Sequence, residues 1–273
     1  MIDWLAICIP IYPPHYEYAY RFLEKTSNLF PIYFVFSSQE DYELFERKDI
    51  IHPLIYPVAI SNGNDSIINR KKLFALHSLQ NSSYTYILIL DAETDFLRES
   101  FEEKRFLQAI ESFFTQKRIY GKTITGSRHY RQIVQIMKTC AESMPPEVFN
   151  CILKETDNFT IYTWWSDLPL YKREDLPDFL SKLEAQSISW FHFDHILYSY
   201  YLLGYHNFTI FNLEPYIQDP TVFFEDYIPD EEFQVQRLHE LGVQYMYVRY
   251  SLYTKFSKLF DKFGSLFLFH LNR

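Results

Sequence analysis

The chain has 273 residues, a length that allows one large α/β domain or two small ones. It contains 6 glycines, where average usage of about 7% would give roughly 19, and no two of them share one short loop. This excludes the glycine-rich phosphate loops of Rossmann, P-loop and kinase sites. The net charge of −9 argues against nucleic acid as a partner, because such binding depends on basic groups at phosphates.

Strand-like and helix-like segments alternate along the first half of the chain. Continuous apolar runs predict buried strands, and apolar residues at helical spacing predict helices. The expected strands are 4–12, 31–38, 53–60 and 84–90, and the expected helices are 15–27, 40–47, 69–79 and 100–115. This alternation predicts an α/β fold with a mixed, mostly parallel sheet of Rossmann type, flanked by helices.

The second half of the chain is less regular. Residues 120–190 are expected to mix short strands with proline-rich and tryptophan-rich segments, followed by a helix at 191–203 and a strand at 207–213. Residues 231–273 are expected to be wholly helical. The expected division is a main domain at 1–230, with a first half at 1–118 and a second half at 119–230, and a helical extension at 231–273.

The cysteines and the apolar segments indicate a compartment. The three cysteines are odd in number and lack metal-site spacing, which favours reduced thiols and a cytoplasmic protein. No window approaches 18 consecutive apolar residues, so we expect no spanning helix. Segment 1–14 lacks a basic start and contains Asp3, which favours a strand over a signal peptide.

Three acidic residues alternate directly after the strongest strand: Asp91, Glu93 and Asp95. In an extended backbone, residues two apart point the same way, so Asp91 and Glu93 would project together from the carboxyl end of a strand. Neighbouring carboxylates need a counter-cation to remain ionised, and oxygen ligands suit Mg²⁺ or Mn²⁺. The pattern therefore predicts a metal or diphosphate site; a polar loop capping the strand is the alternative.

These features together resemble the GT-A glycosyltransferases. The similarity consists of a first strand ending in Ile-Pro-Ile-Tyr, a second buried strand, a basic helix and an aliphatic strand closing in Asp-x-Glu, and it extends over roughly residues 4–215. It implies a glycosyltransferase in which Asp91, Glu93 and Asp95 hold Mn²⁺ or Mg²⁺ against the diphosphate of a nucleotide-sugar, with a UDP-sugar favoured. The acceptor would be a glycan or lipid-linked glycan in bacterial surface polysaccharide synthesis.

The resemblance also implies that 1–230 is a catalytic domain, with 1–118 as its nucleotide-sugar half and 119–230 as its acceptor half, and it assigns residues to the nucleotide-sugar. The residues expected to bind it are Pro10, Tyr12, Ser37, Glu40, Lys71, Lys72 and Asp91. Tyr12 would stack on the base, while Lys71 or Lys72 would contact the diphosphate in place of a glycine-rich loop. A solvated first helical turn is the alternative for these lysines and Arg70, although basic groups at a helix N-terminus call for a compensating partner.

Aromatic and acidic residues further along suit the acceptor. The residues expected to bind it are Trp164, Trp165, Asp167 and Trp190, since exposed rings stack on sugar faces; tryptophans packed in the core are the alternative. By the resemblance, Asp194 would be the catalytic base that deprotonates the acceptor hydroxyl, with a structural N-cap as the alternative. A late histidine, His239 or His270, would complete the metal shell.

The segment 249–273 has five basic residues against one acid, with Leu and Phe at helical spacing. A basic amphipathic helix of this kind is typical of contact with a membrane surface, here the cytoplasmic face; a helix packed on the domain is the alternative.

Two other functions compete with the glycosyltransferase. A metal-dependent sugar nucleotidyltransferase also uses paired acids, although the glycine-rich entry loop of such enzymes is missing here. A non-catalytic domain that binds carbohydrate or a partner protein through its aromatic residues is the other.

Overall fold

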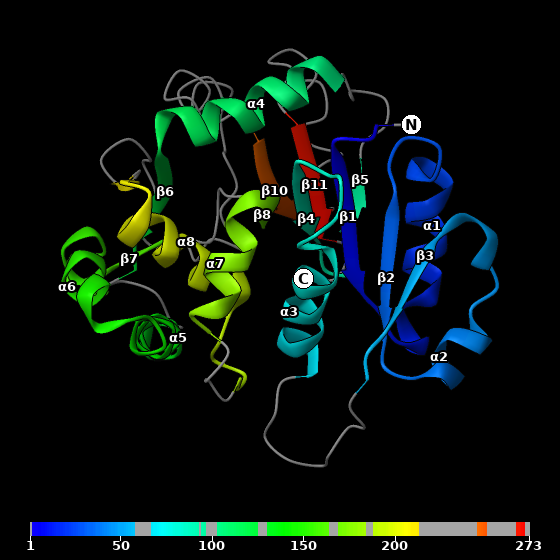
Figure 1. Cartoon of the computed structure of the whole chain (residues 1–273), viewed down its shortest axis with the longest axis horizontal. Helices are drawn as coiled ribbons and strands as arrows, with labels where there is room; N and C mark the ends of the chain where they lie inside the picture. The colour runs from blue at the N-terminus through cyan, green and yellow to red at the C-terminus, as the bar shows by residue number, and fades with distance from the viewer. Residues whose placement is uncertain are drawn as a thin grey trace. The chain divides into compact units, whose positions relative to one another are not determined.

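The computed structural model describes residues 2–57, 67–92, 94–96, 103–124, 130–163, 169–183, 188–212, 245–249 and 266–270 (Figure 1). Contacts divide the chain into two units. Unit 1 comprises Met1–Phe96 and Pro169–Asp194, and unit 2 comprises Leu97–Leu168 and His195–Arg273. Unit 1 is therefore interrupted in sequence by the first segment of unit 2, while the domain boundaries expected at residues 118 and 230 stay predictions.

Unit 1 is built on a five-stranded sheet with the order β3-β2-β1-β4-β8. Its strands are β1 Leu5–Pro10, β2 Ile32–Phe36, β3 His52–Ile55, β4 Tyr86–Ile89 and β8 Leu170–Lys172. The first four pair in parallel, with β1, β2 and β3 in blue in Figure 1, and β8 joins β4 antiparallel. The mixed, mostly parallel sheet predicted from the sequence is confirmed.

Helices cover this sheet. Unit 1 contains η1 Pro13–His15, α1 Tyr16–Thr26, α2 Gln39–Leu44, η2 Lys48–Ile50, α3 Ile67–Leu79, η3 Arg173–Asp175 and α7 Leu176–Ser181, with a short strand β5 Thr94–Phe96. Every residue of β1 and β4 is buried, so side chains on both faces of these strands are covered. Helix α3 packs against β1, β2 and β4.

The strand order reverses between β1 and β4. The chain passes from β1 outward to β2 and β3, and then returns through α3 to the other side of β1 as β4. Open α/β sheets bind ligands outside the carboxyl ends of the strands that flank such a reversal. Tyr12 and Asp91, which follow the ends of β1 and β4, therefore stand where a ligand is expected.

Unit 2 contains a second sheet with the order β7-β6-β9. Its strands are β6 Arg118–Thr123, β7 Ile161–Tyr162 and β9 Thr209–Asn212, and its helices are α4 Glu103–Gln116, α5 Tyr130–Glu142, α6 Pro146–Glu155 and α8, which begins at Asp194 and ends at Tyr205. The sequence predicts short strands over part of this region and misses α5 and α6. In α5, Ile133, Ile136, Met137 and Cys140 recur at helical spacing and are buried, which is the signal that identifies it.

Two glycines of unit 2 lie where a side chain has no room. A Cβ at Gly121 would be 2.8 Å from Cγ2 of Ile161, the neighbouring strand residue. At Gly204, in α8, it would be 2.3 Å from Cγ1 of Val148 in α6. These glycines therefore allow close packing of a strand pair and of a helix pair.

The C-terminal region contains two strands, β10 Tyr245–Arg249 and β11 Leu266–His270, which pair in parallel. The helix predicted over 231–273 is wrong at these segments. A run such as Leu-Phe-Leu-Phe fits either period, and aromatic residues favour the strand when a partner strand is present. The predicted membrane contact depended on a helix at 249–273 and loses that basis at β11; the other residues between 250 and 273 lie outside the described part of the chain.

Within the described ranges, no helix has both the length and the apolar character needed to cross a bilayer.

Candidate functional site

The first turns of α3 carry three buried polar side chains. Asn69, Lys71 and Lys72 are 1%, 3% and 7% exposed. Because α3 connects β3 to the parallel strand β4, its N-terminal end lies at the carboxyl edge of the sheet. Buried lysines and asparagines require partners, and these three find them in three separate segments of unit 1.

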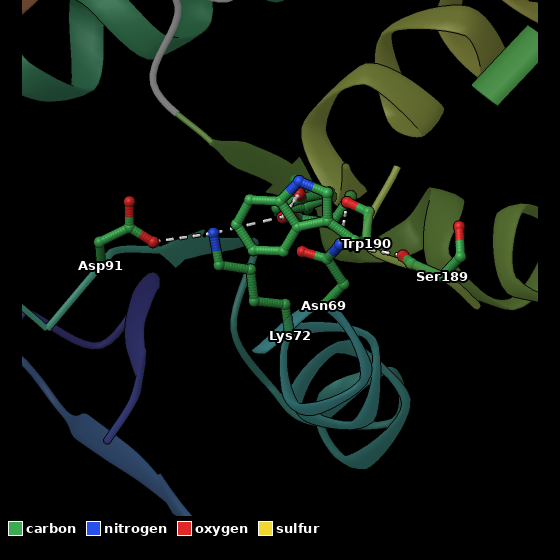
Figure 2. A network of polar contacts seen from close by, with 7 residues as sticks. Asn69, Lys72, Asp91, Ser189 and Trp190 are labelled. Carbon is green, nitrogen blue, oxygen red and sulfur yellow. Dashed lines mark hydrogen bonds and ion pairs between the residues drawn. The ribbon is translucent and has the colours of Figure 1, made fainter. Parts of the chain in front are cut away.

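Lys72 lies between two carboxylates. Its Nζ is 2.9 Å from Oδ1 of Asp91 (Figure 2). The same Nζ is 3.7 Å from Oδ1 of Asp194. Burial alone would lower the pKa of Lys72, but the two carboxylates outweigh burial and raise the pKa above its usual value. Lys72 is therefore a buried ammonium ion, and the compensating partner expected for a basic group at this helix end is confirmed.

Asp194 is the innermost member of this group. Its side chain is fully buried, whereas that of Asp91 is 33% exposed. The hydroxyl of Tyr171, in β8, donates a hydrogen bond to Oδ2 of Asp194. A general base must contact the hydroxyl that it deprotonates, and the Asp194 carboxylate is closed to solvent in this structure. The role of Asp194 as catalytic base stays a prediction.

Asn69 holds the segment that carries Trp190. Its Nδ2 donates to the carbonyl oxygens of Ser189, at 3.2 Å, and Trp190, at 3.0 Å (Figure 2). The same segment is closed by His192, whose Nδ1 accepts from the backbone N–H of Ser189 at 2.9 Å, and burial lowers the pKa of His192. Trp190 is 44% exposed and lies on a turn that these hydrogen bonds hold in place. Its ring is therefore accessible to a ligand.

Lys71 is directed to the end of β1. Its Nζ donates to the carbonyl oxygen of Ile11 at 2.7 Å. Burial lowers the pKa of Lys71 to about 8, and the nearby Asp41 carboxylate offsets part of that shift. Lys71 and Lys72 therefore differ: one is held by a carbonyl and loses its proton more readily, while the other is held by carboxylates and keeps it.

The residues expected at the base and ribose lie on the loops after β1 and β2. Tyr12 is 44% exposed, and its ring centroid is 4.1 Å from that of His15. Ser37 is partly exposed just after β2, and Glu40 is exposed in the first turn of α2, while Pro10 is buried at the end of β1. The structure therefore brings the predicted nucleotide-side positions to one edge of the unit 1 sheet.

The acidic motif does not continue as an extended strand. The backbone N–H of Thr94 donates to the carbonyl oxygen of Asp91 at 3.0 Å, so the chain turns after Asp91 and β5 begins at Thr94. The prediction that Asp91 and Glu93 point the same way assumed an extended backbone after Asp91, and that assumption is wrong. Glu93 and the side chain of Asp95 lie outside the described residues.

Of the two described carboxylates at Lys72, only that of Asp91 is exposed to an incoming divalent cation. The described side chains contain no group of three or more His, Cys, Asp or Glu residues arranged to hold a metal ion. Mg²⁺ in nucleotide sites commonly takes one or two protein carboxylates and completes its shell with phosphate and water oxygens. The oxygen chemistry of Asp91 fits such a cation, which would share that carboxylate with Lys72.

Several predicted residues cannot be placed. Trp164, Trp165, Asp167 and His239 lie outside the described residues, and His270 is described only as part of the β11 backbone. Sequence analysis in turn misses Asn69, Tyr171 and His192. Asn69 could have been found from its place in the basic first turn of the helix, whereas nothing in the sequence distinguishes Tyr171 from the other tyrosines.

No protein-family model matches the chain, and no curated protein matches it. Among solved structures, S. aureus TarS 1–349 superposes with a TM-score of 0.35 at 11% identity, covering 76% of this chain and 57% of that one. The mannose-1-phosphate geranyltransferase from Thermus thermophilus gives a TM-score of 0.30 at 11% identity, covering 78% and 70%. The chain thus spans less than two thirds of TarS 1–349, and likenesses this weak assign it neither a family nor an activity.

Proposed function

We propose that this protein is a transferase that binds a nucleoside-diphosphate sugar at the carboxyl edge of the unit 1 sheet and passes the sugar to a glycan or lipid-linked glycan. A UDP-sugar is the donor that the sequence resemblance favours. The observation that carries the proposal is the partly exposed Asp91 carboxylate, fixed by buried Lys72 beside the reversal of strand order.

Each donor group has a matching side chain in the proposal. The exposed ring of Tyr12 stacks on the nucleobase, and Ser37 and Glu40 lie beside the ribose. Lys71 supplies positive charge toward the diphosphate. Together they replace the glycine-rich phosphate loop that the sequence lacks.

Mn²⁺ or Mg²⁺ bound at Asp91 would supply positive charge to the departing nucleoside diphosphate. Asp91 holds the cation. The exposed ring of Trp190, on the turn held by Asn69 and His192, stacks on the acceptor sugar. The proposal assigns no base to the transfer, because the predicted base, Asp194, is wholly buried.

Thermal denaturation of the full chain tests this proposal. Wild-type protein is heated with a panel of nucleoside diphosphates and nucleotide-sugars, with and without Mn²⁺ or Mg²⁺. A ligand at 100 times its Kd stabilises the folded state by about 2.7 kcal/mol, a readily measured shift in Tm. We expect UDP or a UDP-sugar with Mn²⁺ to raise the Tm most. When a glycan acceptor is added to the protein with the UDP-sugar and Mn²⁺, we expect UDP to be released.

The matched variants are Asp91→Asn and Asp178→Asn. Asp178 lies in α7 of the same unit and pairs with Lys182 at 3.0 Å, with its side chain 56% exposed. Asp91→Asn is expected to abolish the ligand-dependent shift, and Asp178→Asn to retain it. The proposal fails if no nucleotide stabilises the wild type, or if Asp91→Asn is stabilised as much as the wild type.

A further inference from the structure

Asp194 and Asp91 contact the same lysine but differ in their exposure to solvent. The Asp194 carboxylate is fully buried, contacts the Tyr171 hydroxyl through Oδ2 and faces Lys72 through Oδ1. Asp91, at the other end of the group, has a third of its side chain exposed. A ligand at the sheet edge can therefore contact the Asp91 carboxylate but not the fully buried Asp194 carboxylate.

Tyr171, Asp194, Lys72 and Asp91 form a continuous chain of polar contacts from the interior to the surface. Tyr171 orients the Asp194 carboxylate, Asp194 attracts the Lys72 ammonium from within, and Lys72 binds Asp91 from behind. A buried carboxylate loses its hydration and needs compensating contacts. Oδ2 of Asp194 accepts a hydrogen bond from Tyr171, and Oδ1 faces the Lys72 ammonium at 3.7 Å, an ion-pair distance longer than a hydrogen bond. The same contacts restrict the rotamers of the Lys72 side chain, which is flexible when it is exposed to solvent.

From this we infer that Asp194 and Tyr171 are positioning residues, which hold Lys72 so that it fixes the Asp91 carboxylate in the orientation that binds the nucleoside diphosphate. The inference rests on the proposed function for the identity of the ligand. It assigns Asp194 a role through Lys72, in place of direct contact with the acceptor.

A double-mutant cycle measures whether Asp194 acts through Lys72. The affinity for UDP in the presence of Mn²⁺ is measured by titration calorimetry for wild type, Asp194→Asn, Lys72→Met and the double variant. We expect each single substitution to weaken UDP binding by roughly tenfold or more, as loss of a supporting residue does in metal sites. The double variant is expected to bind within about twofold of Lys72→Met, because residues of one chain of contacts are not additive.

Two results of this cycle would overturn the inference. If the two effects multiply in the double variant, Asp194 acts independently of Lys72. If Asp194→Asn binds UDP as the wild type does but no longer transfers sugar, Asp194 is a base. The two roles are thus separated by whether binding or turnover is impaired.

Tyr171→Phe keeps the packing of the ring and removes only the hydroxyl, so it tests the inference even if Asp194→Asn folds poorly. It is expected to weaken UDP binding in the same direction as Asp194→Asn and by a smaller factor. Tyr162→Phe is the matched control, since Tyr162 is also fully buried but belongs to β7 of unit 2. Equal affinities of the two Phe variants and the wild type would contradict the role of Tyr171.

Crystal structures of ligand-free wild type and Asp194→Asn test the ion pair itself. The wild type should show Asp91 in one conformer on Lys72, and Asp194→Asn should show Asp91 turned away from Lys72 or divided among several conformers. An unchanged Asp91–Lys72 ion pair in the variant would refute the inference. If the wild type binds no UDP, the proposed function fails, while these two structures still decide whether Asp194 positions Lys72.

Discussion

The residues that define the candidate site are unusual because they are polar and buried. Asn69, Lys71 and Lys72 occupy the first turns of one helix, and each has its own partners: 189–190 for Asn69, Ile11 for Lys71, and Asp91 and Asp194 for Lys72. Such side chains are rarely buried unless they are paired, because desolvation of a polar group costs several kcal/mol (about 2–7). Their burial therefore makes the arrangement of the three segments specific.

Lys71 leads to a prediction about pH. Its pKa is about 8 in the folded protein against 10.5 when exposed, so between these pH values the unfolded chain holds a proton that the folded chain has released. The free energy of unfolding should then rise with pH across this window, by at most about 1.4 kcal/mol per pH unit. The rise should be absent in Lys71→Met, as measured by urea denaturation at several pH values.

The difference between wild type and variant is the decisive quantity, because other groups titrate in the same window. Lys138→Met, an exposed position in α5, serves as the matched control and should follow the wild type at every pH. A constant difference between wild type and Lys71→Met from pH 8 to pH 10.5 would show that Lys71 has the same pKa in both states.

At the scale of elements, helix packing in unit 2 depends on one missing side chain. A Cβ on Gly204 would lie 2.3 Å from Cγ1 and 2.7 Å from Cβ of Val148, distances that force α8 and α6 apart. Gly204→Ala should therefore destabilise the protein by about 1–3 kcal/mol, the usual cost of overpacking, despite the better helix propensity of alanine. Thermal or urea denaturation measures this loss.

Val148→Ala in the same chain provides the control. Alone it removes buried methyl groups and should also destabilise the protein. Combined with Gly204→Ala it makes room for the new methyl group, so the double variant should be more stable than the sum of the single losses predicts. Strict additivity would show that the two side chains do not meet.

Sequence reasoning predicts the elements of the first 90 residues well because apolar runs and helical spacing mark them. The apolar run before Asp91 has the length and composition of a buried strand, and the structure places β4 at Tyr86–Ile89 within it. The turn after Asp91 is missed because alternating acids fit an extended strand equally well, and only the Thr94 bond to the Asp91 carbonyl distinguishes the two. The C-terminal strands are missed because pairing between β10 and β11 depends on residues distant in sequence.

The site is predicted less completely than the fold. Lys72 and Asp91 are identified individually, from a basic helix turn and an acidic motif, but their contact follows from the passage of α3 across β1 and β4. The contribution of Tyr171 depends on the antiparallel addition of β8 to β4, which no local pattern indicates. Contacts between segments that are separated in the sequence, such as β4 and β8, are beyond periodicity arguments, which are local.

For the whole molecule, the division into two units predicts which backbone amides a bound nucleotide protects from hydrogen exchange. The residues proposed to bind the donor all belong to unit 1, on loops that follow β1, β2 and β4 and at the start of α3. Hydrogen exchange with and without UDP and Mn²⁺ should therefore show added protection at 11–12, 37–41 and 91–92. The Asp91→Asn variant should show no such protection, and protection confined to unit 2 would contradict the assignment of the donor site.

The interruption of unit 1 has a consequence for synthesis on the ribosome. β8 and Asp194 are made only after the whole segment Leu97–Leu168. Until then β4 lacks its neighbour β8, and Lys72 can pair with Asp91 but not with Asp194. At roughly 5–20 residues per second, the interval between Asp91 and Asp194 is on the order of 5–20 s. A nascent chain in this interval exposes an open strand edge, and Lys72 gains the support of Asp194 only after the intervening segment has emerged.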